Sequence, residues 1–239
     1  MNKRHFLKLA GASFALAPVA SMAAISQTNT TNINDISGLS DITANAKPIT
    51  VEERKARIEK AQSLMKAQDI AAILVEPGAA MDYFSGIKWW RSERLTALVI
   101  PQKGDMAVVT PFFEKPSVLE SLAIGDDVRV WQEHESPFDV VANILKSRGI
   151  TSGNIGFESS VRYFVVTGVS QALPNMSIVP AEPITLGCRM YKTPSELALM
   201  HKANEVTLRA YEFVFDNLKL GMSQQDVKSL MNTAQQRLG

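Results

Sequence analysis

The sequence has 239 residues, of which 25 are Lys or Arg and 24 are Asp or Glu, so the net charge is +1 at pH 7. This near-neutral balance argues against nucleic acid or an acidic membrane surface as a partner. The single cysteine, Cys188, excludes an intramolecular disulfide framework and a zinc site built from several cysteines. We expect Cys188 to be a small buried residue rather than a reactive thiol.

Residues 1–23 resemble an export signal. A charged start at Lys3 and Arg4 precedes an apolar stretch over 7–19 and a small-residue cleavage pattern over 21–23. The segment Arg4-His5-Phe6-Leu7-Lys8 resembles a twin-arginine signal with Lys3 in place of the first Arg, which leaves the general secretory route open. The apolar run is short for a bilayer, so we expect a periplasmic or secreted protein without a stable membrane anchor.

Residues 24–49 are rich in Asn, Thr and Ser. Such a segment buries too little apolar surface to offset its ordering entropy, so we expect a disordered linker. Ordered structure should begin at Thr50, because its hydroxyl and Glu53 form a capping-box pattern that opens a helix.

Short apolar runs then alternate with amphipathic segments as far as residue 179. The continuous apolar runs are typical of strands covered on both faces, and the turn at 102–105 indicates an antiparallel hairpin. The pattern therefore predicts an α/β fold over residues 50–185, with helices packed on a mixed sheet. Strands are predicted at 70–75, 95–100, 106–110, 128–131, 154–157 and 176–179, and helices at 114–122, 138–146 and 161–173.

From residue 194 onward the pattern is helical. Thr193 is placed as an N-cap, Pro194 occupies the first helical position and Glu196 can reach back to the N–H of the cap. A second helix, capped by Ser223, follows the turn at 221–223. Two helices cannot bury their apolar faces alone, so we expect residues 186–239 to be the start of a larger domain.

This part of the sequence resembles the entry to the catalytic domain of the creatinase, prolidase and aminopeptidase P family. The resemblance rests on Arg189-Met190-Tyr191-Lys192-Thr193-Pro194-Ser195-Glu196-Leu197, on Ala203-Asn204-Glu205 and on Gly221-Met222-Ser223. Residues 50–185 resemble the N-terminal domain of that family, and residues 186–239 resemble the helical start of an incomplete pita-bread α+β domain. The resemblance implies the N-terminal portion of an exported Xaa-Pro aminopeptidase-like metallohydrolase, which cleaves peptide bonds with a metal-activated water.

The family resemblance supplies no metal site. The family uses two Asp, one His and two Glu on the sheet of its catalytic domain, and no residue here matches any of the five. The resemblance thus implies a binuclear Mn, Zn or Co centre in a longer enzyme, but no cofactor and no catalytic residue in these 239 residues, which should be inactive as given. We expect His134 to lie in a solvated loop and His201 on a helix surface.

One stretch has the composition of a recognition loop. Trp89, Trp90, Arg91 and Arg94 lie between a turn glycine, Gly86, and a predicted strand. Arg offers a bidentate clamp for a carboxylate and Trp offers a flat apolar wall, which together suit a peptide or a small acid as substrate.

The resemblance extends to this loop through the segment from Tyr83 to Gly86. In dimeric relatives the corresponding loop lies over the partner's active site, which implies a homodimer here. In creatinase-like members an Arg there binds the substrate carboxylate, and Arg94 is the nearest match, with Arg91 second. The alternative is structural: one Trp packs in the core and the Arg residues pair with Glu93 at the surface.

Two other functions stay open at this stage. A creatinase-like C–N hydrolase of a small molecule would use the same fold. A non-catalytic module would keep the N-terminal domain for dimerisation or binding. The reading frame beyond Gly239 would separate an enzyme, which needs the five ligands, from such a module.

Overall fold

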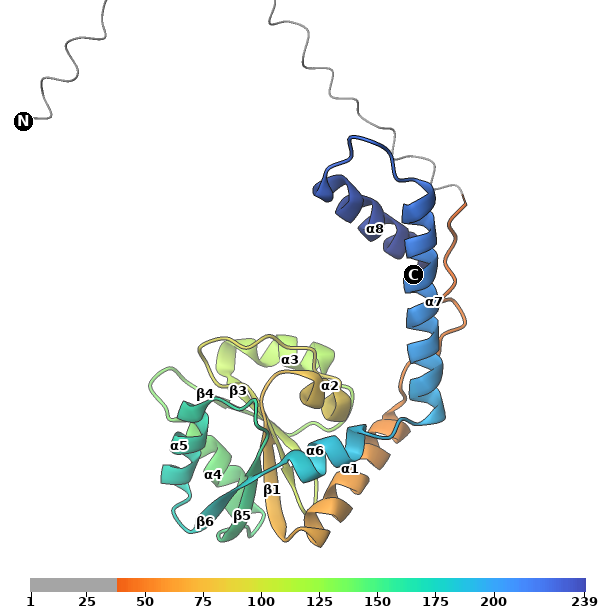
Figure 1. Cartoon of the computed structure of the whole chain (residues 1–239). Coiled ribbons are helices and arrows are strands. Elements are labelled where there is room, and N and C mark those ends of the chain that lie inside the picture. The colour runs from red at the N-terminus through yellow and green to blue at the C-terminus, as the bar shows by residue number, and fades with distance from the viewer. Residues whose placement is uncertain (1–37) are drawn as a thin grey trace, which may run out of the picture. The chain divides into compact units, whose positions relative to one another are not determined.

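The computed structural model describes residues 38–239, which divide into two compact units. One comprises residues 43–205, and in the other residues 38–42 join residues 206–239 (Figure 1). The predicted export signal at 1–23 and most of the predicted linker lie outside the described residues. Among residues 38–239 no helix has both the length and the apolar character needed to cross a bilayer.

A six-stranded mixed sheet lies at the centre of the larger unit, in the order β4-β3-β2-β1-β5-β6. β2 runs antiparallel to β1 and β3, and the other neighbouring strands are parallel. The predicted mixed sheet and its hairpin are confirmed, with each strand within two residues of its expected position. The strands are β1 (Ile70–Val75), β2 (Ala97–Pro101), β3 (Ala107–Pro111), β4 (Val128–Trp131), β5 (Gly153–Phe157) and β6 (Met176–Pro180).

Helices cover both faces of this sheet. The first face carries α1 (Val51–Ala67), α2 (Ala79–Ser85), α3 (Lys115–Ser121) and α6 (Glu182–Arg189), and the second carries α4 (Pro137–Ser147) and α5 (Tyr163–Ala172). Alternate side chains of β1 enter the two cores: Ile73 and Val75 on the first face, Ala72 and Leu74 on the second. The continuous apolar run of β1 thus follows from burial on both sides.

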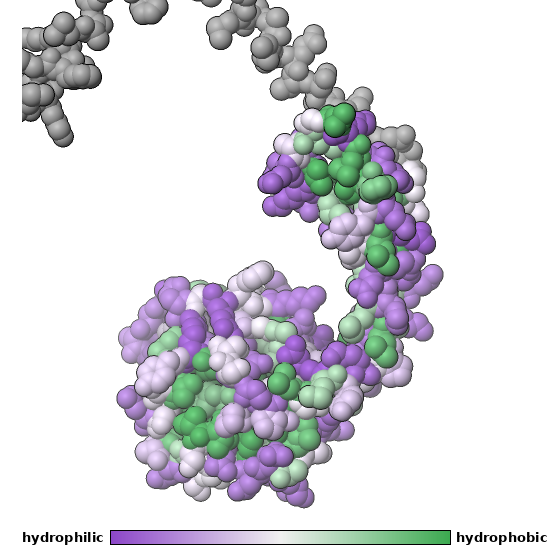
Figure 2. All heavy atoms as spheres, viewed as in Figure 1, coloured by the Kyte–Doolittle hydropathy of each residue, from purple (hydrophilic) through white to green (hydrophobic). Residues whose placement is uncertain are grey.

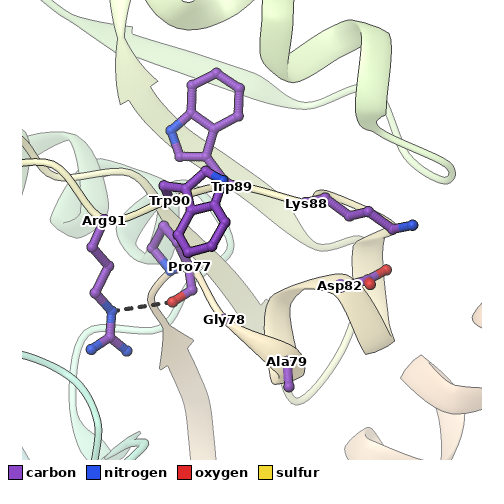
Figure 3. A pocket seen from close by; sticks show the side chains of 8 residues that line it. All are labelled: Pro77, Gly78, Ala79, Asp82, Lys88, Trp89, Trp90 and Arg91. Carbon is purple, nitrogen blue, oxygen red and sulfur yellow. Dashed lines mark hydrogen bonds between the residues drawn. The ribbon is translucent and has the colours of Figure 1, made fainter. Parts of the chain in front are cut away.

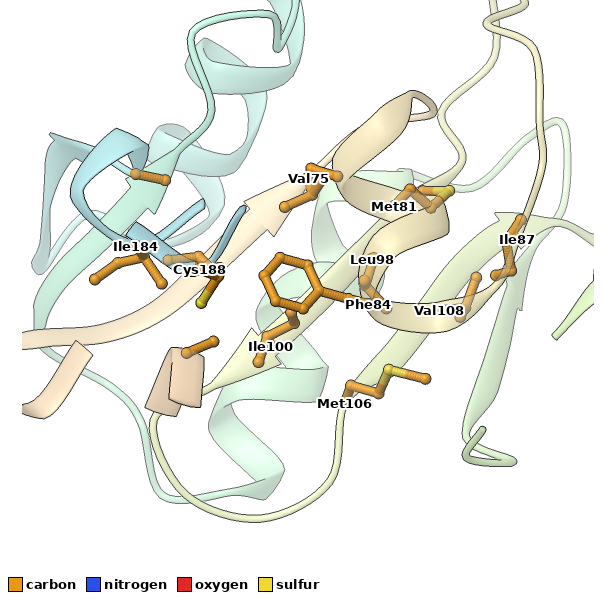
Figure 4. Close-up of a cluster of buried hydrophobic side chains, with 14 of the residues drawn as sticks. Val75, Met81, Phe84, Ile87, Leu98, Ile100, Met106, Val108, Ile184 and Cys188 are labelled. Atoms are coloured by element: carbon orange, nitrogen blue, oxygen red, sulfur yellow. The ribbon is translucent and has the colours of Figure 1, made fainter. Parts of the chain in front are cut away.

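The core of the first face surrounds Phe84 of α2 (Figure 4). Its neighbours in the view include Leu98 and Ile100 from β2 and Cys188 from α6. Cys188 is 1% exposed and forms no disulfide, which confirms its expected role as a small buried residue. Burial raises the pKa of its thiol, an effect opposed by the charge of Lys60.

Two helices of this unit were missed by the sequence analysis. α2 has seven residues and no side-chain cap at Gly78, and α6 begins with Pro183 in its first turn. Neither is long enough to show several turns of apolar periodicity, the pattern that most clearly indicates a helix. The expected capping box at the start of α1 is present: Thr50 N donates to Glu53 Oε2 at 2.8 Å and Glu53 N donates to Thr50 Oγ1 at 3.1 Å.

The smaller unit is helical. α7 (Pro194–Asp216) contributes its second half, and α8 (Gln224–Leu238) starts at the predicted Ser223 cap. Its buried cluster consists of Ala210, Ala234 and Leu238, with Leu39 and Ile42 packed against it. The described end of the predicted linker has no helix or strand, yet it contacts this cluster. Figure 2 shows hydrophobic side chains on the visible surface of this unit, and exposed apolar residues of α7 include Leu208, Tyr211 and Phe215.

Candidate functional site

The residues that the sequence predicts for recognition lie on the loop between α2 and β2, defined here as the Trp-Arg loop (residues 87–94). Its position follows from the sheet: β1 and β2 are antiparallel with Val75 opposite Leu98, so the start of β2 lies beside the end of β1. Gly86 ends α2 in the left-handed conformation, with φ 87°, and turns the chain into the loop.

An open pocket of about 530 Å³ lies between this loop and the turn that follows β1 (Figure 3). Three of the four predicted site residues contribute to it. Its lining consists of Pro77, Gly78, Ala79, Asp82, Lys88, Trp89, Trp90 and Arg91. A pocket with two indole rings, two cations and one carboxylate can receive a small zwitterionic or acidic molecule.

The two Trp residues differ in burial. Trp89 is half-buried and packs against the core of the first face, whereas the Trp90 side chain is 92% exposed. Arg91 is held at the pocket edge, because its Nε donates to Pro77 O at 3.1 Å and its Nη2 donates to Ser160 Oγ at 2.8 Å. The orientation of Arg91 is thereby fixed before any ligand binds.

Arg94 does not line the pocket. Its Nε donates to Glu133 Oε1 at 2.7 Å, its Nη1 donates to Glu93, and its guanidinium lies 5.4 Å from the ring centre of Phe113. The hydrogen bond to Glu133 raises the pKa of Arg94. The structural alternative, a Trp packed in the core and an Arg paired with Glu93, therefore describes Trp89 and Arg94. Trp90 and Arg91 instead have the arrangement of a binding site.

Two residues that the sequence analysis did not single out hold the base of the loop. Glu76 follows β1 and is fully buried, and Arg162 is the N-cap residue of α5. Their side chains form an ion pair with an Nη2 to Oε1 distance of 2.6 Å. A charged residue directly after a buried strand was the available signal for Glu76, whereas the partner is 86 residues away in the sequence.

No metal centre is present among residues 38–239, where no three His, Cys, Asp or Glu side chains are grouped closely enough to hold an ion. His134 lies exposed in a turn after β4 and His201 is exposed on α7, as expected. The described residues therefore do not fit the binuclear centre that the family resemblance implies.

Comparisons with known proteins agree with this fold. A family model described as the creatinase/prolidase N-terminal domain matches residues 57–191. An uncharacterized peptidase of Schizosaccharomyces pombe is 26% identical over 195 residues, which cover 76% of this chain and 42% of the relative. A probable dipeptidase PepE of Mycobacterium tuberculosis is 27% identical over 160 residues, covering 66% and 42% of the two chains.

The crystal structure of dipeptidase PepE from Mycobacterium ulcerans superimposes with a TM-score of 0.68 at 26% identity. The match covers 78% of this chain and 50% of that one. The chain thus spans about half the length of the curated relatives it matches.

Proposed function

The chain belongs to the family defined by the creatinase/prolidase N-terminal domain, and from this we propose that it forms the N-terminal portion of a peptidase acting on short peptides. The observation that carries the proposal is the match over residues 57–191, which includes all six strands of the sheet and every element that borders the pocket. The names of the relatives, a peptidase and a probable dipeptidase, support a hydrolase of peptide bonds.

The proposed contribution of this chain is substrate recognition. Arg91 and Lys88 can pair with a peptide carboxylate, Asp82 can accept from an ammonium group, and the Trp90 ring can cover an apolar side chain. Arg94 is the second candidate cation, although it is occupied by Glu133 and Glu93. Bond cleavage is assigned to a divalent metal, Mn, Zn or Co, held by residues other than those described, in a homodimer that brings the loop over the partner's site.

Export is part of the same proposal. The Lys3-Arg4 start, the apolar stretch and the small residues at 21–23 support cleavage of a signal and a periplasmic or secreted enzyme. N-terminal sequencing of the protein from its natural source tests this directly, because an uncleaved Met1 would contradict it.

The decisive experiment uses the native protein. It is captured from its source with an antibody against residues 43–205, its intact mass is measured, and it is assayed on Xaa-Pro and other dipeptides. We expect a mass well above that of the 239 residues, together with dipeptide hydrolysis. A protein with the 26.2 kDa mass or less and no hydrolysis would instead support the non-catalytic binding module.

Substrate recognition is tested in the same protein by Arg91→Ala, with Arg94→Ala as its matched comparison. Loss of one charge-assisted hydrogen bond costs about 1.5–3 kcal/mol, so we expect KM to rise roughly 10-fold or more for Arg91→Ala. The value of kcat should change little, because the contact is made equally in the ground state and the transition state. Unchanged KM in both variants would remove the loop from the substrate site.

A further inference from the structure

The carboxylate of Glu76 is fully buried at the end of β1, where a lone charge would be costly. Arg162 compensates it through three hydrogen bonds. Its backbone N donates to Oε2 at 2.8 Å, and Nε and Nη2 donate to Oε1 at 2.9 and 2.6 Å. The pair therefore joins the end of β1 to the N-cap residue of α5.

The same guanidinium also reaches the Trp-Arg loop. Arg162 Nη1 donates to the carbonyl of Ser92, and Nη2 donates to the carbonyl of Arg94 at 3.2 Å. Its cationic carbon lies 4.7 Å from the ring centre of Phe164, which restricts its motion on another side. One planar group thus contacts a buried carboxylate, an aromatic ring of α5 and two loop carbonyls.

From this arrangement we infer that Glu76 and Arg162 are positioning residues for the Trp-Arg loop. Glu76 fixes the guanidinium, and the guanidinium fixes the backbone on either side of Glu93. Because Ser92 directly follows Arg91, its held carbonyl fixes the backbone from which the side chains of Trp90 and Arg91 extend. Only an Arg fork can serve the carboxylate and both carbonyls together, since the three donors of a Lys ammonium sit on one compact nitrogen and cannot span these acceptors.

The effect on substrate binding rests on the proposed function, but the effect on the loop does not. The loop itself offers a direct readout, because Lys88, Arg91 and Arg94 are trypsin sites. Cleavage of a folded protein at such sites tracks the population of locally opened chain. Cleavage rates at these three bonds, followed by mass spectrometry of the full chain, therefore report how firmly the loop is held.

The test variant is Arg162→Lys, which keeps a cation for Glu76. Its matched control is Arg148→Lys, since Arg148 also donates to a carboxylate, Asp127, and to two carbonyls, those of Ile144 and Asp105. Asp105 lies beyond the end of β2, at the opposite end of the sheet from the loop. We expect cleavage in the loop to accelerate at least about tenfold in Arg162→Lys and to stay within about twofold of the parent in the control.

A second variant, Glu76→Gln, keeps the shape of the buried side chain but removes its charge. We expect a smaller acceleration than in Arg162→Lys and a larger one than in the control. Loop cleavage within twofold of the parent in both test variants, with circular dichroism showing a native fold, would overturn the inference. If Arg162→Lys does not fold, the test is the loop cleavage rate of Glu76→Gln compared with that of the Arg148→Lys control.

Kinetic measurements on the variants of the native protein distinguish this inference from the proposed function. When the loop is released we expect KM for dipeptides to rise several-fold with kcat nearly constant. Faster loop cleavage with unchanged KM would leave the positioning role in place and remove the loop from substrate recognition.

Discussion

At the residue scale, Gly86 is constrained twice. Its φ of 87° lies in the left-handed region, and a Cβ there would be 2.6 Å from Cβ of Ala123. Gly104 has a similar φ of 88° but nothing within 4 Å of such a Cβ. We expect Gly104→Ala to cost about 1–2 kcal/mol for backbone strain alone. Gly86→Ala should cost about 1–3 kcal/mol more, because Ala123 has to move. Urea denaturation measures both, and equal losses would show that the close approach to Ala123 is easily relieved.

Asp127 makes the free energy of unfolding depend on pH in the acid range. Burial raises the pKa of its carboxyl, but hydrogen bonds from Arg129 and Arg148 and their charges outweigh this and hold it below the ordinary value of 3.8. A lowered pKa in the folded state means stabilisation that is present above pH 3.8 and is lost as the pH falls through the folded value. Asp127→Asn should therefore destabilise the protein at pH 7 and destabilise it less at pH 3. Denaturation midpoints at the two pH values measure this, and an equal deficit at both would contradict it.

At the scale of elements, residues 38–42 behave as part of the helical unit. Ile42 N donates to Leu238 O at 2.9 Å, which satisfies a carbonyl at the end of α8, and Leu39 and Ile42 pack on its cluster. We expect Ile42→Ser to destabilise this unit by about 0.5–3 kcal/mol, the usual range for such a loss. Ser40 is exposed, so Ser40→Ala is the control and should change the stability of this unit little. Hydrogen exchange of α8 measures the effect, and equal protection in both variants would show that the contact is not stabilising.

The elements that could be predicted from sequence are those whose information is local. β1 is a six-residue apolar run, and the Thr50 and Thr193 caps each have a Glu three residues later. α2 and α6 were not predicted, because each shows little apolar repeat and is held by burial of Phe84 or Cys188 against distant strands. For the same reason the sequence indicated Trp90 and Arg91 by composition, but could not indicate Arg162, whose partner Glu76 is defined only by tertiary contact.

At the scale of the whole molecule, the two units differ in what they bury. The unit of residues 43–205 has large apolar clusters on both faces of a sheet, and fully buried residues of its cores include Phe84, Leu98 and Ile144. The buried apolar residues of the helical unit, among those described, are Ala210, Val214, Leu230, Ala234 and Leu238. Because stabilisation scales with buried apolar area, the helical unit should open at a much lower free-energy cost.

Limited trypsin digestion of the full chain should therefore cut first within residues 206–239. The start of α7 should survive longer, because Glu196 pairs with Arg57 at 2.8 Å, with side chains 12% and 9% exposed. Breaking a buried pair costs about 3–5 kcal/mol, so Glu196→Ala should move early cleavage back to Lys192. Glu133→Ala, which breaks the exposed pair with Arg94, is the control and should leave the pattern unchanged. Uniform resistance of residues 43–239 to trypsin that persists on dilution would mean that the helical unit is as stable as the sheet. Its small core would then not limit its stability.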